Sequence, residues 1–220
     1  MGRPNQPLLS RGNIARAALE LLDEEGPQAL KMRTLADRLG VKGASLYHHV
    51  ASKEDVLDAV SELINEEIDL SPLDGPDWRA GIAAYARGYR RVYLRHPNAI
   101  APAARRQVEA DRALRGYDAL LAALVRAGCT PARAAEAAAA IDYLVLGSAL
   151  ETFTAGFTRP ADEYRPAYPA LADSLADAAA TGEGLAALDD RGFELGLGLL
   201  LDGLSAQVVQ PEPGAPLPGL

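Results

Sequence analysis

The stretch TLADRLGVKGASLYHHVASK, residues 34–53, decides how this chain is interpreted. Apolar residues recur at helical spacing on both sides of Gly40, which predicts two short helices, residues 32–39 and 44–49, joined by a tight turn. Gly40 suits the left-handed backbone of such a turn, and Ala36 is small where two crossing helices must approach closely. This pattern is typical of a helix-turn-helix, a motif that binds DNA.

Several residues of this stretch are left facing outward once its apolar positions turn inward. They have short or hydrogen-bonding side chains near a helix N-terminus, where base edges and phosphates can be reached. These residues are Lys42, Gly43, Ala44, Ser45, Tyr47 and His48. The motif therefore predicts a DNA-contacting surface at its second helix.

The rest of the chain is also predicted to be helical, because alanine and leucine are abundant and no stretch alternates with period two. A helix at residues 10–25 ends at Gly26, and Ser52 is the expected N-cap of a helix that reaches about residue 68. Proline and glycine within residues 71–76 predict a loop at a domain boundary. The predicted fold class is all-α, with an N-terminal three-helix helix-turn-helix head joined to a larger helical body.

The predicted body follows that loop. Its helices are expected at residues 77–95, 97–106, 110–127, 131–153, 170–180 and 189–209. Residues 158–169 are rich in proline and charge and are expected to form a mobile loop, and the four prolines of residues 210–220 predict a disordered tail. The predicted domains are the head at 1–53, a linking helix at 53–69, the body at 70–209 and the tail at 210–220.

Charge is unevenly distributed along the chain. The formal net charge is −8, yet residues 1–53 carry eight basic and five acidic residues, so that segment is net +3 and the remainder net −11. Phosphate is therefore attracted to the head alone. The polar N-terminus lacks the apolar core of a secretory signal, and eighteen unbroken apolar residues occur nowhere, so we expect a cytoplasmic protein with no membrane partner.

The helix-turn-helix stretch resembles the tetracycline-repressor family of transcription regulators. The matching residues are Leu35, Ala36, Leu39, Gly40, Val41, Ser45, Leu46, Tyr47, His48, His49, Val50, Ser52, Lys53 and Leu57. The resemblance implies that the helix from about residue 43 to 49 enters the major groove of double-stranded DNA. The residues that it implies as phosphate contacts are Met32, Arg33, Tyr47 and Lys53. Those that it implies as facing bases are Lys42, Gly43, Ala44, Ser45 and His48.

The resemblance extends, more weakly, through the C-terminal part of the chain to about residue 209. It rests there on Trp78, the Arg95-His96-Pro97 corner, Gly128, Gly196 and Gly203. In that family two helices of each subunit form the core of a dimer. The candidates here are residues 131–153 and 189–209, whose glycines allow close approach and whose leucines provide apolar area. The resemblance thus implies a homodimer.

The same resemblance implies a small-molecule effector bound in the body. Tyr85 and Tyr89 stand one helical turn apart and match pocket-lining positions of the tetracycline binders, while Tyr117 and Asp142 fall near others. An aromatic stripe of this spacing also fits a buried core, and both interpretations stay open. Residues 99–106 lack the histidine that coordinates a metal in those binders, so magnesium-tetracycline is not the predicted effector, and no metal site or cofactor is expected.

Two other classes of protein are alternatives to a ligand-responsive regulator. An enzyme is disfavoured, and no catalytic residue is assigned, because the chain has three histidines, one cysteine, no glycine-rich phosphate loop and no nucleophile elbow. The second alternative is a DNA-binding protein or adaptor whose body serves only to dimerise. The favoured prediction is a transcription regulator, a repressor that a small molecule releases from a near-palindromic operator.

Overall fold

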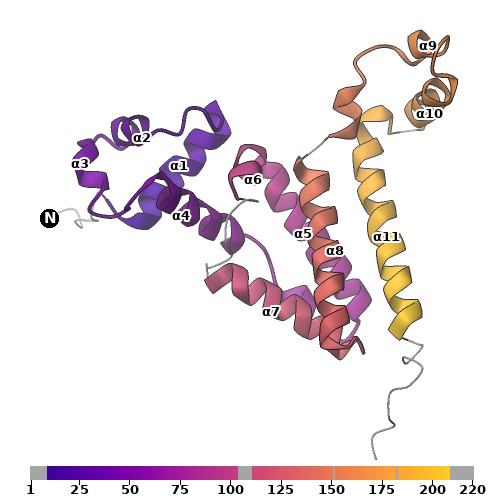
Figure 1. The fold of residues 1–220 in the computed structure, drawn as a ribbon, viewed down its shortest axis with the longest axis horizontal. Coiled ribbons are helices and arrows are strands. Elements are labelled where there is room, and N and C mark those ends of the chain that lie inside the picture. Colours follow the sequence, from indigo (N-terminus) through magenta and orange to yellow (C-terminus); the bar gives the residue numbers. More distant parts are fainter. Residues whose placement is uncertain (1–8, 104–110, 151, 182, 209–220) are drawn as a thin grey trace, which may run out of the picture. The chain divides into compact units, whose positions relative to one another are not determined.

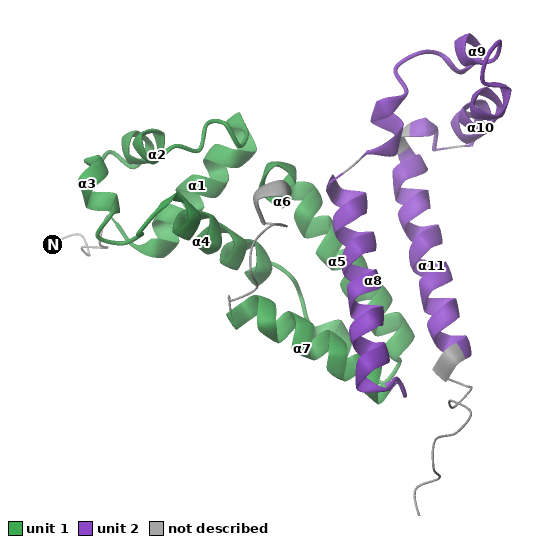
Figure 2. Cartoon of the chain, viewed as in Figure 1, with its two compact units in different colours: residues 1–126 green, residues 127–220 purple. Residues whose placement is uncertain are grey.

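The computed structural model describes residues 9–103, 111–150, 152–181 and 183–208, which contain helices and no strand (Figure 1). This confirms the predicted all-α class. The chain divides into two compact units, Met1–Arg126 and Ala127–Leu220 (Figure 2). The boundary between these units differs from the boundary near residue 70 that was predicted from composition, and the division into functional domains stays a prediction.

Unit 1 begins with the four helices α1 (Arg11–Glu25), α2 (Met32–Arg38), α3 (Gly43–Leu46) and α4 (Lys53–Glu66). The Ser10 hydroxyl caps α1 by accepting a hydrogen bond from the Asn13 amide at 3.1 Å, and Gly26 ends the helix with φ at +83°. The helices enclose a core of fully buried side chains. Its largest members are Ile14, Leu21, Leu22, Leu35, Leu46 and Ile64.

The second helix of the motif is shorter than predicted. The sequence indicated a helix at residues 44–49, whereas α3 is a single turn that ends at Leu46. A turn follows, in which the amides of His49 and Val50 both donate to the Leu46 carbonyl, at 2.9 and 3.0 Å. Tyr47, His48 and His49 are all exposed, and the chain turns there so that Val50 is buried before α4 begins.

The rest of unit 1 consists of η1 (Ser71–Asp74), α5 (Trp78–Arg95), α6 (Pro97–Ala103) and α7 (Asp111–Arg126). The predicted loop at 71–76 contains the 3₁₀ turn η1, which packs against α5. Gly81 makes this possible, because a Cβ atom at that position would lie 2.3 Å from the Pro72 carbonyl oxygen. The predicted end of the helix beyond residue 103 lies outside the described residues.

Unit 2 is built on two long helices that pack side by side, α8 (Pro131–Leu150) and α11 (Leu188–Val208) (Figure 1). A Cβ atom at Gly196 of α11 would lie 3.0 Å from the Leu144 side chain of α8, so glycine allows this close approach, as the sequence suggested. Along the chain, the segment that joins α8 to α11 contains η2 (Phe153–Gly156), α9 (Ala161–Tyr164), α10 (Pro169–Ala180) and η3 (Leu185–Ala187).

The expectation of a mobile loop at residues 158–169 is wrong in one respect, since this segment contains α9. Tyr164 of α9 is buried against Ala172 and Leu175 of α10, and the Arg159 guanidinium lies 4.4 Å from the centre of the Tyr164 ring. One aromatic residue thus gives this proline-rich segment a small core of its own. The predicted tail at 210–220 lies outside the described residues. No helix in the described part of the chain is both long and apolar enough to cross a bilayer.

Candidate DNA interface and effector region

Helices α2 and α3 pack through the apolar residues that the motif places between them. Leu35 and Ala36 of α2 and Leu46 and Val50 around α3 are all at most 3 % exposed. Gly40 turns the chain with φ at +66°, as predicted, and the amide that follows it, of Val41, donates to the Ala36 carbonyl at 3.0 Å. With one side of the pair buried, the residues on the other side face solvent.

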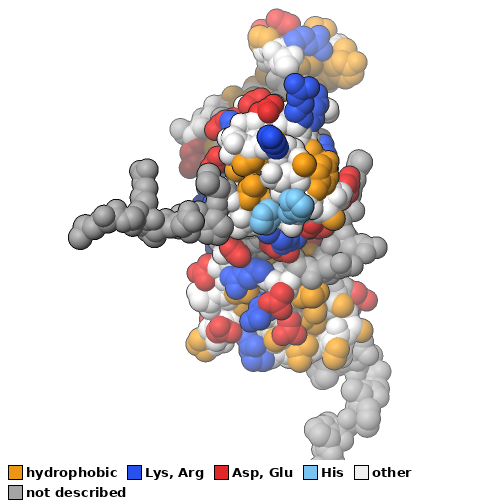
Figure 3. All heavy atoms as spheres, turned by 90° about the vertical axis from the view of Figure 1, so that its left-hand side faces the viewer, with side chains coloured by type: hydrophobic (Ala, Val, Ile, Leu, Met, Phe, Trp, Pro, Cys, Tyr) orange, Lys and Arg blue, Asp and Glu red, His pale blue; other side chains and the backbone are white. Residues whose placement is uncertain are grey.

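All nine predicted DNA contacts lie at the surface of unit 1. The exposed ones are Arg33, Lys42, Gly43, Ala44, Tyr47 and His48, and the half-buried ones are Met32, Ser45 and Lys53. Tyr47 is 56 % exposed, although a lone tyrosine in a helix is usually packed. Figure 3 looks onto this end of the unit, where histidine, lysine and arginine side chains lie near one another. The structure therefore brings the predicted residues to one accessible region.

The start of α4 is held in place by a reciprocal cap. The Ser52 hydroxyl accepts from the Asp55 amide at 3.2 Å, and the Asp55 carboxylate accepts from the Ala51 amide at 2.8 Å. Arg11 of α1 binds Asp55 at 3.2 Å and also pairs with Glu62, which joins α1 to α4. These contacts orient Lys53 and the N-terminus of α4, whose amides and positive dipole end favour a phosphate.

Three of the four predicted effector contacts lie in unit 1. Tyr85 and Tyr89 of α5 are buried, with ring centroids 5.8 Å apart, and Tyr93 continues the row 5.2 Å further on. Tyr117 is half-buried on α7, directly after Gly116, which lies close to the Tyr85 hydroxyl. The fourth, Asp142, is half-buried on α8 of unit 2. The tyrosines have the apolar bodies and polar tips that suit a small-molecule cavity.

Sequence reasoning did not assign a role to the junction where α5 turns into α6. There the Asn98 amide group donates to the Leu22 carbonyl of α1 at 2.9 Å, and His96 lies 2.7 Å from the carboxylate of Asp23. Just after the end of α4, the Ile68 carbonyl accepts from the Arg112 guanidinium of α7 at 2.9 Å. The only sequence signal was the Arg95-His96-Pro97 corner, whose partners lie more than twenty residues away and could not be paired by pattern.

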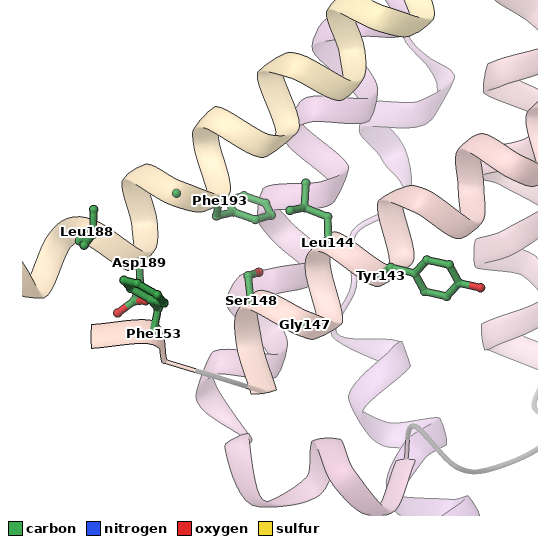
Figure 4. Close-up of a pocket in the computed structure, with 9 residues that line it drawn as sticks. Tyr143, Leu144, Gly147, Ser148, Phe153, Leu188, Asp189 and Phe193 are labelled. Atoms are coloured by element: carbon green, nitrogen blue, oxygen red, sulfur yellow. The ribbon is translucent and has the colours of Figure 1, made fainter. Parts of the chain in front are cut away.

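Unit 2 contains a pocket of about 370 Å³ between α8, η2 and the start of α11 (Figure 4). It is lined by Tyr143, Gly147 and Ser148 of α8 and by Phe153, Asp189 and Phe193. Figure 4 shows Phe153 beside Asp189, and the Thr154 hydroxyl donates to the Asp189 carboxylate at 2.5 Å. Tyr143 is 75 % exposed, and its ring points away from the other labelled residues in Figure 4.

Asp69 and Cys129 have side-chain pKa values shifted by their surroundings. The amide and hydroxyl of Ser71 donate to Asp69 and hold the pKa of that carboxyl below its usual value. Burial raises the pKa of the Cys129 thiol. In the described part of the chain, histidine, cysteine, aspartate and glutamate nowhere gather in a group of three that could hold a metal ion.

Comparison with known proteins identifies both parts of the chain. The family described as "Bacterial regulatory proteins, tetR family" matches residues 14–60, and "Tetracyclin repressor-like, C-terminal domain" matches residues 71–208. An HTH-type transcriptional regulator of Saccharopolyspora erythraea is 43 % identical over 143 residues, which are 65 % of this chain and 61 % of that protein. The chain thus spans somewhat less than two thirds of that relative.

Other relatives match over nearly their whole length. The class A tetracycline repressor from transposon 1721 of Escherichia coli is 32 % identical over 203 residues, which are 90 % of this chain and 91 % of that one. The solved structure of Streptomyces coelicolor ActR in complex with actinorhodin has a TM-score of 0.76 at 27 % identity, covering 92 % of this chain and 98 % of that one. The helix-turn-helix, the matched C-terminal domain and these relatives together show that the chain belongs to the tetracycline-repressor (TetR) family of transcription regulators.

Proposed function

We propose that this protein is a homodimeric repressor that binds a near-palindromic operator and leaves it when a small molecule occupies the body. The single observation that carries the DNA-binding part is the surface of α2 and α3. Their apolar side is buried, and the side left to solvent presents Tyr47, His48 and Lys42 beside the capped start of α4. The names of the relatives, which include tetracycline repressors, support the assignment.

The proposed division of labour on the operator follows from the side chains. Tyr47 and Lys53, with Arg33 and Met32 at the start of α2, hold phosphates and set the register on the duplex. Lys42 and the short residues after it face base edges in the major groove. The residues in that group are Lys42, Gly43, Ala44, Ser45 and His48. Because Gly43 and Ala44 offer few donors, base readout rests on Lys42, Ser45 and His48.

A second copy of the chain is the proposed partner in unit 2. Helix α11 is apolar on two sides: Leu197 and Leu201 are buried, whereas Leu195 and Leu199 are 65 % and 64 % exposed. A helix that is apolar on more than one side needs more than one neighbour, and Tyr143 of α8 adds a large exposed aromatic group. Two recognition surfaces related by a two-fold axis require a near-palindromic operator.

The proposed effector is an aromatic small molecule with polar substituents, contacted by Tyr85, Tyr89, Tyr117 and Asp142. Buried tyrosine rings can stack on such a molecule while their hydroxyls fix its orientation. The structure of ActR was solved in complex with actinorhodin, which supports a small-molecule ligand here. An effector that favours a separation of the two heads that does not match the operator would weaken operator affinity. The coupling free energy would be about 1–3 kcal/mol.

Fluorescence anisotropy on the DNA that flanks the gene, with salt varied, tests the proposal. The wild type should bind one duplex tightly, with log affinity falling as log salt rises. Tyr47→Ala should weaken binding about tenfold, the cost of a hydrogen bond to a charged group. Tyr168→Ala is the matched control, since Tyr168 is equally exposed, at 58 %, but lies in unit 2. Equal affinity of Tyr47→Ala and the wild type would refute the phosphate assignment.

A further inference from the structure

One imidazole ring lies between two carboxylates at the point where α5 turns into α6. Nδ1 of His96 is 2.7 Å from Oδ2 of Asp23 in α1, and Nε2 is 3.4 Å from Oε1 of Glu67, the residue that caps the C-terminal end of α4. The His96 side chain is only 13 % exposed. This single ring therefore contacts both long helices of the helix-turn-helix head.

The hydrogen-bonding chemistry of the ring limits what it can do there. An ionised carboxylate only accepts hydrogen bonds, and a neutral imidazole has one N–H donor and one acceptor lone pair. A neutral His96 can therefore donate to either Asp23 or Glu67. The lone pair of its other ring nitrogen then faces a lone pair of the second carboxylate, which is repulsive. Only the imidazolium donates to both.

The charges around the ring lead to the same conclusion. Arg95 of α5 pairs with the second oxygen of Glu67, so the junction (Asp23, Glu67, Arg95 and His96) contains two acidic groups. Its charges balance only when His96 carries a proton. Asn98 of α6, which bonds to the Leu22 carbonyl next to Asp23, is neutral and adds no charge. A neutral His96 leaves one arginine against two carboxylates.

We propose that His96 is a proton-dependent positioning residue that links the helix-turn-helix head to α5 and α6. Histidine side chains change charge between pH 5 and 8, where aspartate and glutamate are ionised. Without its proton His96 has a single donor, which we expect to stay with Asp23 at 2.7 Å and to leave Glu67 at 3.4 Å. The end of α4 then keeps its contacts with Arg95 and Arg112 but loses the one with His96, and we expect it to open more often.

Regulation by pH follows if the proposed function is correct. The position of α4 sets how the recognition surface is presented, because α4 packs along α1 and carries Lys53 at its start. A change at its C-terminal end alters the operator affinity of the effector-free protein. This consequence rests on the proposed function, whereas the link through His96 can be measured without DNA.

Amide hydrogen exchange on the full-length, DNA-free protein measures the link. Protection of the amides of residues 64–70, corrected for the intrinsic effect of pH on exchange, should fall about two- to fivefold between pH 6 and pH 8, as expected for a partly exposed ion pair. In His96→Gln, which keeps a neutral donor, and in Glu67→Gln, the protection should not depend on pH. A wild type with equal protection at both pH values would overturn the proposal.

The chain offers a matched control for histidine loss. His49 is exposed in the turn after α3, and His49→Gln should keep the pH dependence of the wild type. If His96→Gln instead retained that dependence and His49→Gln lost it, the assignment to His96 would be wrong. Both variants replace one histidine by glutamine, so the comparison does not depend on the overall composition of the protein.

Operator binding tests the regulatory part separately. On a palindromic duplex selected from random sequence, the ratio of dissociation constants at pH 6 and pH 8 should differ at least twofold between the wild type and His96→Gln. Equal ratios would refute the regulatory consequence. If the wild type bound no duplex at either pH, the proposed function would fail, and the exchange experiment would still decide whether His96 links the helices.

Discussion

Gly81 lies on the face of α5 that receives the backbone of η1. A Cβ atom there would meet the Pro72 carbonyl oxygen at 2.3 Å, a distance at which the backbone must move. Gly81→Ala should therefore destabilise unit 1 by about 1–3 kcal/mol, the usual cost of overpacking, and lower the midpoint of urea unfolding. Gly88→Ala is the control, because nothing lies within 4 Å of that position in the same helix. There alanine should be stabilising by about 0.5–1 kcal/mol through helix propensity.

The reactivity of Cys129 tests burial without a measurement of the free energy of unfolding. Its thiol is 9 % exposed, and burial raises its pKa, so less thiolate is present at a given pH than for an unfolded cysteine. Alkylation by iodoacetamide at pH 8, followed by mass spectrometry, should be slower in the native protein than in the urea-unfolded chain, and it should accelerate as pH is raised further. A native rate equal to the unfolded rate would show that the thiol is accessible.

At the scale of the elements, the N-cap of α4 connects stability with the proposed DNA contact at Lys53. Ser52→Ala removes the hydroxyl that accepts from the Asp55 amide and should cost about 1 kcal/mol of unfolding free energy. Asparagine or aspartate at position 52 should restore most of it. Ser61→Ala is the control in the same helix, because its hydroxyl only bonds back to the Leu57 carbonyl at 3.0 Å. A cap variant as stable as this control would argue against the observed cap.

The elements also show where pattern reading succeeds. The starts of α1, α4 and α5 were predicted within a residue, because serine or aspartate side chains cap them. The length of α3 was overestimated, since the turn after Leu46 depends on how Val50 packs beneath it. The helix α9 was missed because a single turn that ends at Tyr164 has no periodicity to detect.

At the scale of the whole molecule, the exposed leucines of α11 predict the oligomeric state. Replacing Leu195 and Leu199 by glutamate places two charges on the surface proposed to meet a second copy, where burying them would be costly. Sedimentation velocity should show the wild type as a dimer and the double variant as a monomer, with weaker operator binding. Leu114→Glu, at a 49 % exposed site on α7, is the control and should remain dimeric. A dimeric double variant would place the interface elsewhere.

The candidate sites differ in how far apart their residues lie in the sequence, and this decides which of them could be predicted. The DNA-contacting surface could be predicted because all nine residues fall within 22 positions of the chain, from Met32 to Lys53. The junction at His96 could not, because its partner Asp23 is 73 positions away and becomes a neighbour only through the packing of α1 against α6. Tyr85 and Tyr89 are buried in the structure, which fits both a core and a ligand cavity, so their role as effector contacts stays a prediction.

The placement of the head in the same compact unit as α5, α6 and α7 limits how such regulators can be recombined (Figure 2). A chimera that joins residues 1–70 to a foreign body would lose the Asn98 side chain that covers the Leu22 carbonyl and the Arg112 guanidinium that covers the Ile68 carbonyl. Transferring the DNA-binding head to another body therefore requires that α6 and the start of α7 be included with it, or that the new body supply equivalent hydrogen-bond donors. For an engineer of biosensors, the practical crossover point of this protein lies after α7 and not at the loop near residue 70.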